Sequence, residues 1–122
     1  MAKKIFYVDD SNTMRMSMCA TLEMAGYDVE FAADGQEALE RLQAGLKPDL
    51  IITDVNMPRM NGLDLIRHAK AMPGLRFTPI LTLTTEGQTD KREESRRLGA
   101  SGWLVKPIAG PDLIRVIQRV VV

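Results

Sequence analysis

The chain has 122 residues, of which 45% are hydrophobic and 26% charged, and its 16 basic side chains balance 16 acidic ones. This size predicts one domain, residues 1–122, and the zero net charge argues against nucleic acid as the main ligand, because phosphate-backbone binding needs a basic surplus. The single cysteine, Cys19, excludes an intrachain disulfide and fits a reducing cytoplasm, and no apolar run suggests a signal peptide or is long enough for a membrane span.

Five short runs that are rich in apolar and β-branched residues predict β-strands. They are Lys4–Val8, Asp28–Ala32, Asp49–Thr53, Ile80–Leu83 and Gly102–Val105. The first, third and fourth runs are almost wholly apolar, which is typical of strands covered on both faces.

Helical patterns separate these runs and predict five helices, at about residues 12–25, 35–44, 62–71, 88–98 and from 111 onward. In the first helix Met14, Met18, Leu22 and Ala25 share one face. The fourth has almost no apolar face, so we expect it to be the least rigid. The last carries a wider apolar stripe than contact with one sheet requires, so part of it is expected to face a partner.

The strict alternation of strands and helices predicts an α/β fold, a single doubly wound five-stranded parallel sheet in the order 2-1-3-4-5, of flavodoxin-like type. The switch point of such a sheet lies between the first and third strands. These two strands deliver Asp9, Asp10 and Asp54 to one edge. Lys106 follows the last strand and is expected at the same edge.

Three carboxylates and one amine in a single cleft suggest a site for a divalent cation and a phosphoryl group. Mg²⁺ prefers oxygen ligands and often uses one or two carboxylates, for which Asp10 and Asp54 are the candidates. A carboxylate can also be the nucleophile toward phosphorus, and Lys106 supplies a positive point charge for a phosphate oxygen. The hydroxyl of Thr84 or of Thr85, at the end of the fourth strand, is placed to bond a further phosphate oxygen.

Four sequence pieces, taken together, resemble the receiver domain of two-component response regulators, of the stand-alone chemotaxis (CheY-like) type. They are Val8-Asp9-Asp10, the stretch 53–58 with Asn61-Gly62, Leu83-Thr84-Thr85-Glu86, and Lys106-Pro107. They occur in the family's order and spacing, and the resemblance spans about residues 3–121.

The resemblance implies a role for each matching residue. Asp54 is the expected phosphoacceptor, and Mg²⁺ is expected on Asp10, Asp54 and the backbone carbonyl of Asn56, with Asp9 acting through water. Lys106 is the expected phosphate-binding lysine, before a cis peptide bond to Pro107.

The same resemblance implies residues that switch or tune the domain. Thr84 is the expected switch hydroxyl, and Trp103 occupies the position of a mobile aromatic side chain. Asn56 and Glu86 match positions that tune phosphate hydrolysis. Thr85 is larger than the residue often found at its position, which is expected to narrow access to the phosphoacceptor.

Single pieces of this pattern have simpler interpretations. Asp9 and Asp10 alone could form a turn with a helix cap, Lys106 could be solvated in a plain turn, and Trp103 could be a half-buried core aromatic. Only the joint placement of all four pieces favours the phosphoryl site.

Three classes of function remain open at this point. The leading one is a phosphorylation-activated switch and not an enzyme, with a sensor histidine kinase as phosphodonor and an effector such as a flagellar motor switch as target. Such a switch could also serve as a phosphate sink for a shared kinase. The alternatives are a Mg²⁺-dependent aspartyl phosphatase, which Asn56 two residues after Asp54 disfavours because an amide is no general acid, and a flavin- or nucleotide-binding module.

The chain ends soon after the last predicted helix. We therefore expect a free-standing, monomeric receiver in the cytoplasm, with no contact to nucleic acid or membrane.

Overall fold

The computed structural model describes residues 2–57, 59–85 and 89–121. It contains a five-stranded parallel sheet in the order β2-β1-β3-β4-β5, which confirms the predicted doubly wound fold. The strands are β1 (Lys4–Val8), β2 (Asp28–Ala32), β3 (Leu50–Asp54), β4 (Ile80–Thr85) and β5 (Gly102–Lys106).

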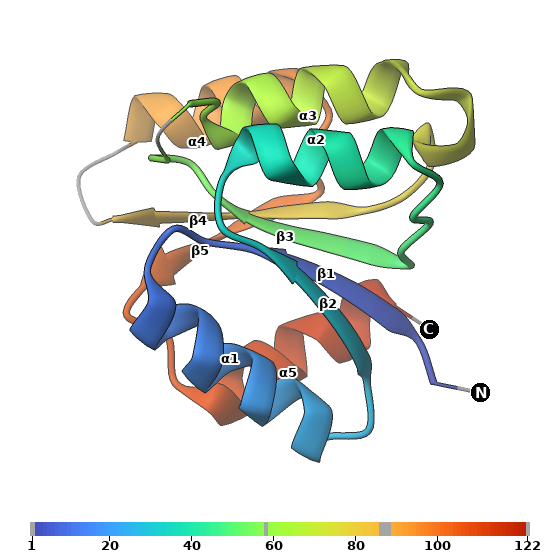
Figure 1. The fold of residues 1–122 in the computed structure, drawn as a ribbon. Helices are drawn as coiled ribbons and strands as arrows, with labels where there is room; N and C mark the ends of the chain where they lie inside the picture. Colours follow the sequence, from blue (N-terminus) through green and yellow to red (C-terminus); the bar gives the residue numbers. More distant parts are fainter. Residues whose placement is uncertain (1, 58, 86–88, 122) are drawn as a thin grey trace.

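Helices cover both faces of the sheet, with α1 and α5 on one side and α2, α3 and α4 on the other (Figure 1). Their bounds are α1 (Asn12–Met24), α2 (Gly35–Gln43), α3 (Gly62–Ala71), α4 (Thr89–Arg97) and α5 (Gly110–Val120), and a 3₁₀ turn, η1 (Pro73–Leu75), follows α3. A helix lies between each pair of consecutive strands, as parallel crossovers require.

Three strands extend further at their carboxyl ends than the sequence predicts. β3 includes Asp54, β4 continues to Thr85, and β5 continues to Lys106. Backbone pairing explains the extension, because Asp54 lies opposite Leu83 and Thr85 lies opposite Lys106 in the ladder. The polar side chains at this edge are therefore held by regular sheet structure.

The first helix ends one residue before the predicted boundary. Ala25 is the C-cap, and Gly26 follows with a φ of 97°, the left-handed conformation that glycine adopts without strain. Met18 and Leu22 are buried as predicted. The expected place of Ala25 on the buried face is wrong: Ala25 is exposed because it lies beyond the last helical residue.

The core has two layers, one on each side of the sheet. Alternate residues of the strands enter opposite layers, so Phe6 packs with α2 and α3 while Ile5 and Tyr7 pack with α1 and α5. Ser95 is the one buried residue in the described α4. This agrees with the predicted lack of an apolar face on that helix, although its predicted start at Gln88 lies outside the described residues.

Two glycines let the loops near the site approach other backbone closely. A Cβ on Gly62 would lie 2.2 Å from the backbone oxygen of Asp54, and one on Gly35 would lie 2.2 Å from that of Met60. Both positions exclude any larger residue without a backbone shift, so the loop after β3 is packed tightly against its neighbours. Within the described chain, no helix combines the length and apolarity that crossing a bilayer requires.

Candidate functional site

The carboxyl ends of β1, β3 and β5 bring the predicted acids and the lysine together. One carboxylate oxygen from each of Asp9, Asp10 and Asp54 lies within 4.8 Å of the others. Asp9 and Asp54 are buried and Asp10 is exposed. The cluster therefore has two acids held inside the protein and one at its mouth.

Lys106 reaches this cluster from the far edge strand. Its Nζ donates to Oδ2 of Asp54 at 2.6 Å and lies 3.4 Å from Oδ2 of Asp9. The Lys106–Pro107 peptide bond is cis, as the family resemblance implied. The single ammonium thus bridges two buried carboxylates that would otherwise repel each other.

Neighbouring donors fix the buried carboxylates in place. Asp9 accepts hydrogen bonds from the hydroxyl of Tyr7 at 3.1 Å and from the amide of Ser11 at 3.0 Å. Asp54 accepts a bond at 3.3 Å from the amide of Asn56, two residues along the chain. These donors leave oxygen lone pairs of both acids available to other ligands.

Burial and charge set the ionisation of these groups. Burial raises the pKa of the Asp54 carboxyl above its usual value, and the hydrogen bond and charge of Lys106 oppose that rise. Burial alone would lower the pKa of Lys106, but its bond to Asp54 and the nearby carboxylates outweigh burial and raise it. Burial, together with the charge of Asp9, raises the pKa of Tyr7, so its hydroxyl remains a proton donor.

The donor set fits a hard divalent cation. Three carboxylates with oxygens this close together match the all-oxygen coordination that Mg²⁺ prefers, and the exposed Asp10 leaves the cluster open to solvent water. Softer metals would require sulfur or imidazole ligands. Cys19 and His68 contribute none, because the acid cluster consists of aspartates alone.

The two threonines at the end of β4 differ in their surroundings. Thr84 is 1% exposed, and its hydroxyl donates to the carbonyl of Leu104 at 3.5 Å, whereas Thr85 is exposed. The Thr84 hydroxyl therefore lies inside the protein, against β5, in the strand next to the one that carries Asp54.

Trp103 lies on β5 and is 41% exposed. The guanidinium of Arg92, from α4, lies 5.8 Å from the centroid of its ring, which places a cation over an aromatic face. The Nε atom of Arg92 is buried without a hydrogen-bond partner. Glu86, the other predicted tuning position, lies outside the described residues.

A family profile for the response regulator receiver domain matches residues 5–118 of the chain. The chain belongs to this family. Chemotaxis protein CheY1 of Helicobacter pylori (strain J99) is 40% identical over 119 residues, which are 97% of this chain and 95% of that protein.

Two solved structures are similar to this receiver along nearly its whole length. The chemotaxis response regulator CheY4 of Vibrio cholerae has a TM-score of 0.92 and 45% identity, over 98% of this chain and 99% of that one. The receiver domain of a sensor histidine kinase from Pseudomonas aeruginosa has a TM-score of 0.89 and 29% identity, over 99% and 98% of the two chains. That second structure holds a magnesium ion coordinated in its active-site cleft. Receiver domains and CheY proteins act in signalling and are not classical enzymes.

The receiver also contains site contacts that sequence reasoning missed. Arg15 donates to the backbone carbonyl of Asp9 at 2.8 Å. The hydrogen bond from Tyr7 to Asp9 could have been predicted from the sequence. Strand residues two apart point to the same side, and Asp9 directly follows the strand that carries Tyr7.

A second missed contact anchors the loop after β3. The guanidinium of Arg59 forms two 3.0 Å bonds with the carboxylate of Asp34, which also caps α2 by accepting from the amide of Glu37 at 2.8 Å. Burial alone would raise the pKa of Asp34, but the bonds from Arg59 and from the Glu37 amide outweigh it and hold that pKa below its usual value. No sequence spacing signals this pair, because its members come from different loops.

Proposed function

We propose that this receiver is a phosphorylation-activated signalling switch, in which Asp54 accepts a phosphoryl group from a histidine kinase. The observation that carries the proposal is the 2.6 Å contact between Lys106 and Asp54 beside two further carboxylates from the adjacent strand. A buried carboxylate with an ammonium on one oxygen, next to a cation site, supplies the positioning and the positive charge that phosphoryl transfer requires.

The transfer itself needs few protein groups. A carboxylate oxygen of Asp54 forms a bond to phosphorus, the P–N bond to the kinase histidine breaks, and the histidine nitrogen keeps the electron pair and takes a proton from solvent. Asp10, Asp54 and the carbonyl of Asn56 would hold Mg²⁺, with Asp9 acting through water. When bound, this ion supplies positive charge against the phosphoryl oxygens.

Lys106 then has two successive partners. In the unmodified protein it neutralises Asp54 and Asp9. After transfer, the same ammonium binds a phosphoryl oxygen, so the new negative charge keeps a protein cation beside it. The acyl phosphate is an anhydride that water slowly hydrolyses, at a rate tuned by Asn56 and Glu86, so the protein resets itself without turning over any other substrate.

The signal leaves the site through the end of β4. The Thr84 hydroxyl turns from the Leu104 carbonyl to the phosphoryl group, and the space it leaves lets Trp103 move inward. The exposed Thr85 at the rim narrows the path to Asp54.

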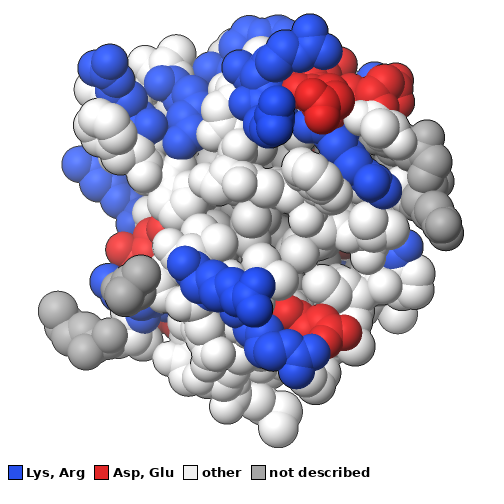
Figure 2. All heavy atoms as spheres, turned by 180° about the vertical axis from the view of Figure 1, so that it is seen from behind, with Lys and Arg blue, Asp and Glu red and all other residues white. Residues whose placement is uncertain are grey.

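The output surface in this proposal is the face of α4, β5 and α5. Because α4 is held by few buried contacts, a small change beside it can shift its position. Seen from behind, uncharged side chains occupy the middle of the visible face, and charged side chains, most of them basic, surround them above, below and on the left (Figure 2). An effector protein of the chemotaxis type, such as a flagellar motor switch, is the partner proposed for this face, and the working form is a cytoplasmic monomer of one domain, residues 1–122.

A labelling experiment tests the assignment. The wild type and the Asp54→Asn variant are incubated with Mg²⁺ and acetyl phosphate, and the intact masses are followed with time. The wild type should gain one phosphoryl group and lose it again after donor removal, whereas Asp54→Asn should gain none. Asp64→Asn, which changes a half-buried carboxylate that pairs with Arg67 on α3, is the matched control and should behave as the wild type. Equal labelling of Asp54→Asn would reject the proposed phosphoacceptor.

A further inference from the structure

An apolar surface with no partner lies at the opposite edge of the sheet from β5. Of the large hydrophobic side chains that are exposed in the described chain, Met16 and Met24 project from α1 and Phe31 from the edge strand β2. They are 72%, 89% and 51% exposed. Exposed apolar clusters of this kind are typical of binding surfaces.

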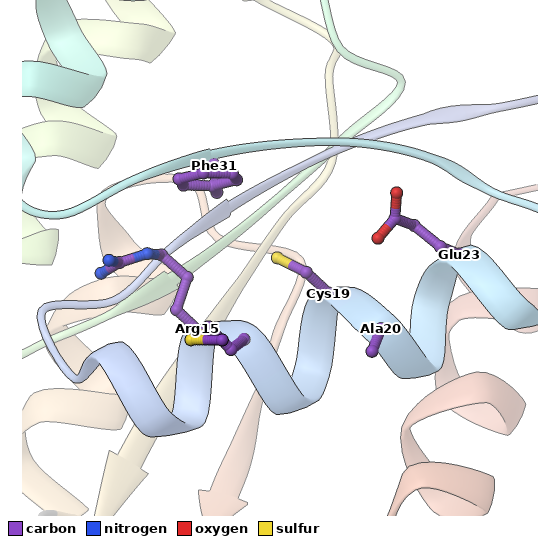
Figure 3. Close-up of a pocket in the computed structure, with 6 residues that line it drawn as sticks. Arg15, Cys19, Ala20, Glu23 and Phe31 are labelled. Atoms are coloured by element: carbon purple, nitrogen blue, oxygen red, sulfur yellow. The ribbon is translucent and has the colours of Figure 1, made fainter.

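A cavity of about 440 Å³ lies within this surface (Figure 3). Its lining residues are Arg15, Met16, Cys19, Ala20, Glu23 and Phe31. Cys19 is 8% exposed, and burial raises the pKa of its thiol to about 11. The thiol therefore stays protonated, and the cavity is suited to packing and not to covalent or metal chemistry.

The lining of α1 is arranged symmetrically. Arg15, Cys19 and Glu23 form one row along the helix, and Arg15 and Glu23 rise on either side of Cys19 (Figure 3). Met16, Ala20 and Met24 form the neighbouring row, since residues four apart lie on one side of a helix. The ends of each row are about 12 Å apart along the axis.

This arrangement is complementary to itself when it is turned end for end. An antiparallel second copy would place its Glu23 opposite Arg15 and its Arg15 opposite Glu23. In the neighbouring row each Met16 would meet a Met24, with the two Ala20 residues at the centre. A twofold axis requires this reciprocity, in which one residue contacts a second and the second contacts the first.

We propose that the α1 face, defined as Arg15, Met16, Cys19, Ala20, Glu23 and Met24, docks a second copy of this chain in an antiparallel twofold dimer. Glu23 has no ion pair with any other described residue. The guanidinium of Arg15 donates to Asp9 and Asn12 and lies over the ring of Phe31, but it has five N–H donors, so others remain for the Glu23 carboxylate of the second copy. Methionine is flexible enough to fill the hollow beside the small Ala20.

The dimer is weak and leaves α4 and β5 of the proposed output surface free. One helix pair buries less area than a stable interface needs, so we expect a dissociation constant of about 0.1 to 1 mM, and the monomer remains the working form at low concentration. Because β2 and β5 are opposite edges of the sheet, docking on α1 does not cover α4 or β5.

A charge-exchange experiment tests this pairing. Sedimentation equilibrium should show the apparent mass of the wild type rising above 13.6 kDa with concentration. Glu23→Arg and Arg15→Glu should each weaken self-association at least about tenfold. An equimolar mixture of the two variants should associate as the wild type does, because that heterodimer again holds two arginine–glutamate pairs. Glu40→Arg, the same charge change on α2, should have no effect.

A second variant covers the case in which Arg15→Glu, which loses the bond to Asp9, does not fold. Ala20→Arg puts two like charges at the centre of the dimer from an exposed helical position, and Ala71→Arg makes the same change on α3. Only Ala20→Arg should abolish association. A wild type that stays monomeric at millimolar concentration overturns the proposal, even if the cavity then binds a small aromatic probe such as anilinonaphthalene sulfonate. Equal effects of Ala20→Arg and Ala71→Arg, or no rescue in the mixture of folded variants, also overturn it.

Discussion

Replacing Lys106 by methionine should destabilise the metal-free protein by about 3 kcal/mol. The ammonium is 2.6 Å from Asp54 and 3.4 Å from Asp9, and only 19% of its side chain is exposed. At an effective dielectric constant of about 20, these distances correspond to gross attractions of about 6 and about 5 kcal/mol. Methionine keeps most of the packing contacts of the lysine side chain and carries no charge that must be desolvated. The net loss of stability is therefore much smaller than the gross attraction. The remaining loss reflects two buried carboxylates left without a cation.

Mg²⁺ should offset part of this loss of stability. In the wild type the ion must share Asp54 and Asp9 with Lys106, whereas in Lys106→Met the carboxylates are free. The variant should therefore bind Mg²⁺ about tenfold more tightly, and saturating Mg²⁺ should narrow the stability gap by about 1.4 kcal/mol through preferential binding to the native state.

Urea unfolding followed by circular dichroism, with chelator and with Mg²⁺, measures both quantities. Lys47→Met, at an exposed lysine, is the matched control and should change stability by less than about 0.5 kcal/mol. A metal-free Lys106→Met protein as stable as the wild type, or a gap that Mg²⁺ leaves unchanged, would show that the ammonium does not neutralise this cluster.

Three further predictions follow from contacts around the site. Asp34→Asn keeps the helix cap but loses the negative charge that pairs with Arg59, so its cost of about 0.5 kcal/mol at pH 7 should vanish as the pH falls through the lowered pKa of Asp34; a cost independent of pH in urea titrations would contradict this. Gly62→Ala should cost more than about 2 kcal/mol in thermal or urea unfolding, since its Cβ would meet backbone oxygen at 2.2 Å, whereas Gly74→Ala, whose Cβ would be 3.3 Å from a flexible lysine, should cost little. Arg92→Ala removes a contact of about 0.5 to 1 kcal/mol that covers one face of the exposed Trp103 ring, so acrylamide should quench the emission of this single tryptophan more in the variant; unchanged quenching would show that Arg92 does not shield the ring.

The sequence predicted the fold and the members of the acid cluster because both depend on short-range patterns. Apolar runs followed at once by polar residues mark the carboxyl ends of buried strands, and parallel topology brings those ends together. Asp54 and Lys106 are 52 residues apart, yet their strands β3 and β5 flank β4 in the sheet, so strand order brings the two side chains to the same edge.

Contacts that depend on side-chain reach were not predictable in the same way. The Arg59–Asp34 pair joins two loops, and the Arg15 bond to the Asp9 carbonyl requires a particular rotamer at the start of α1. Neither follows from hydrophobic periodicity. The misplacement of Ala25 has a different origin, since element boundaries shift by a residue where a helix end frays into its cap.

The most direct test of Asp54 as the phosphoacceptor is to trap the acyl phosphate and identify the residue that carries it. Wild-type protein is phosphorylated with acetyl phosphate and Mg²⁺, reduced with borohydride, which converts an aspartyl phosphate to homoserine, and digested for peptide mass spectrometry. Homoserine is expected at residue 54, with Asp9 and Asp10 unchanged. Homoserine at residue 9 or 10, or phosphate recovered on a residue other than an aspartate, would contradict it.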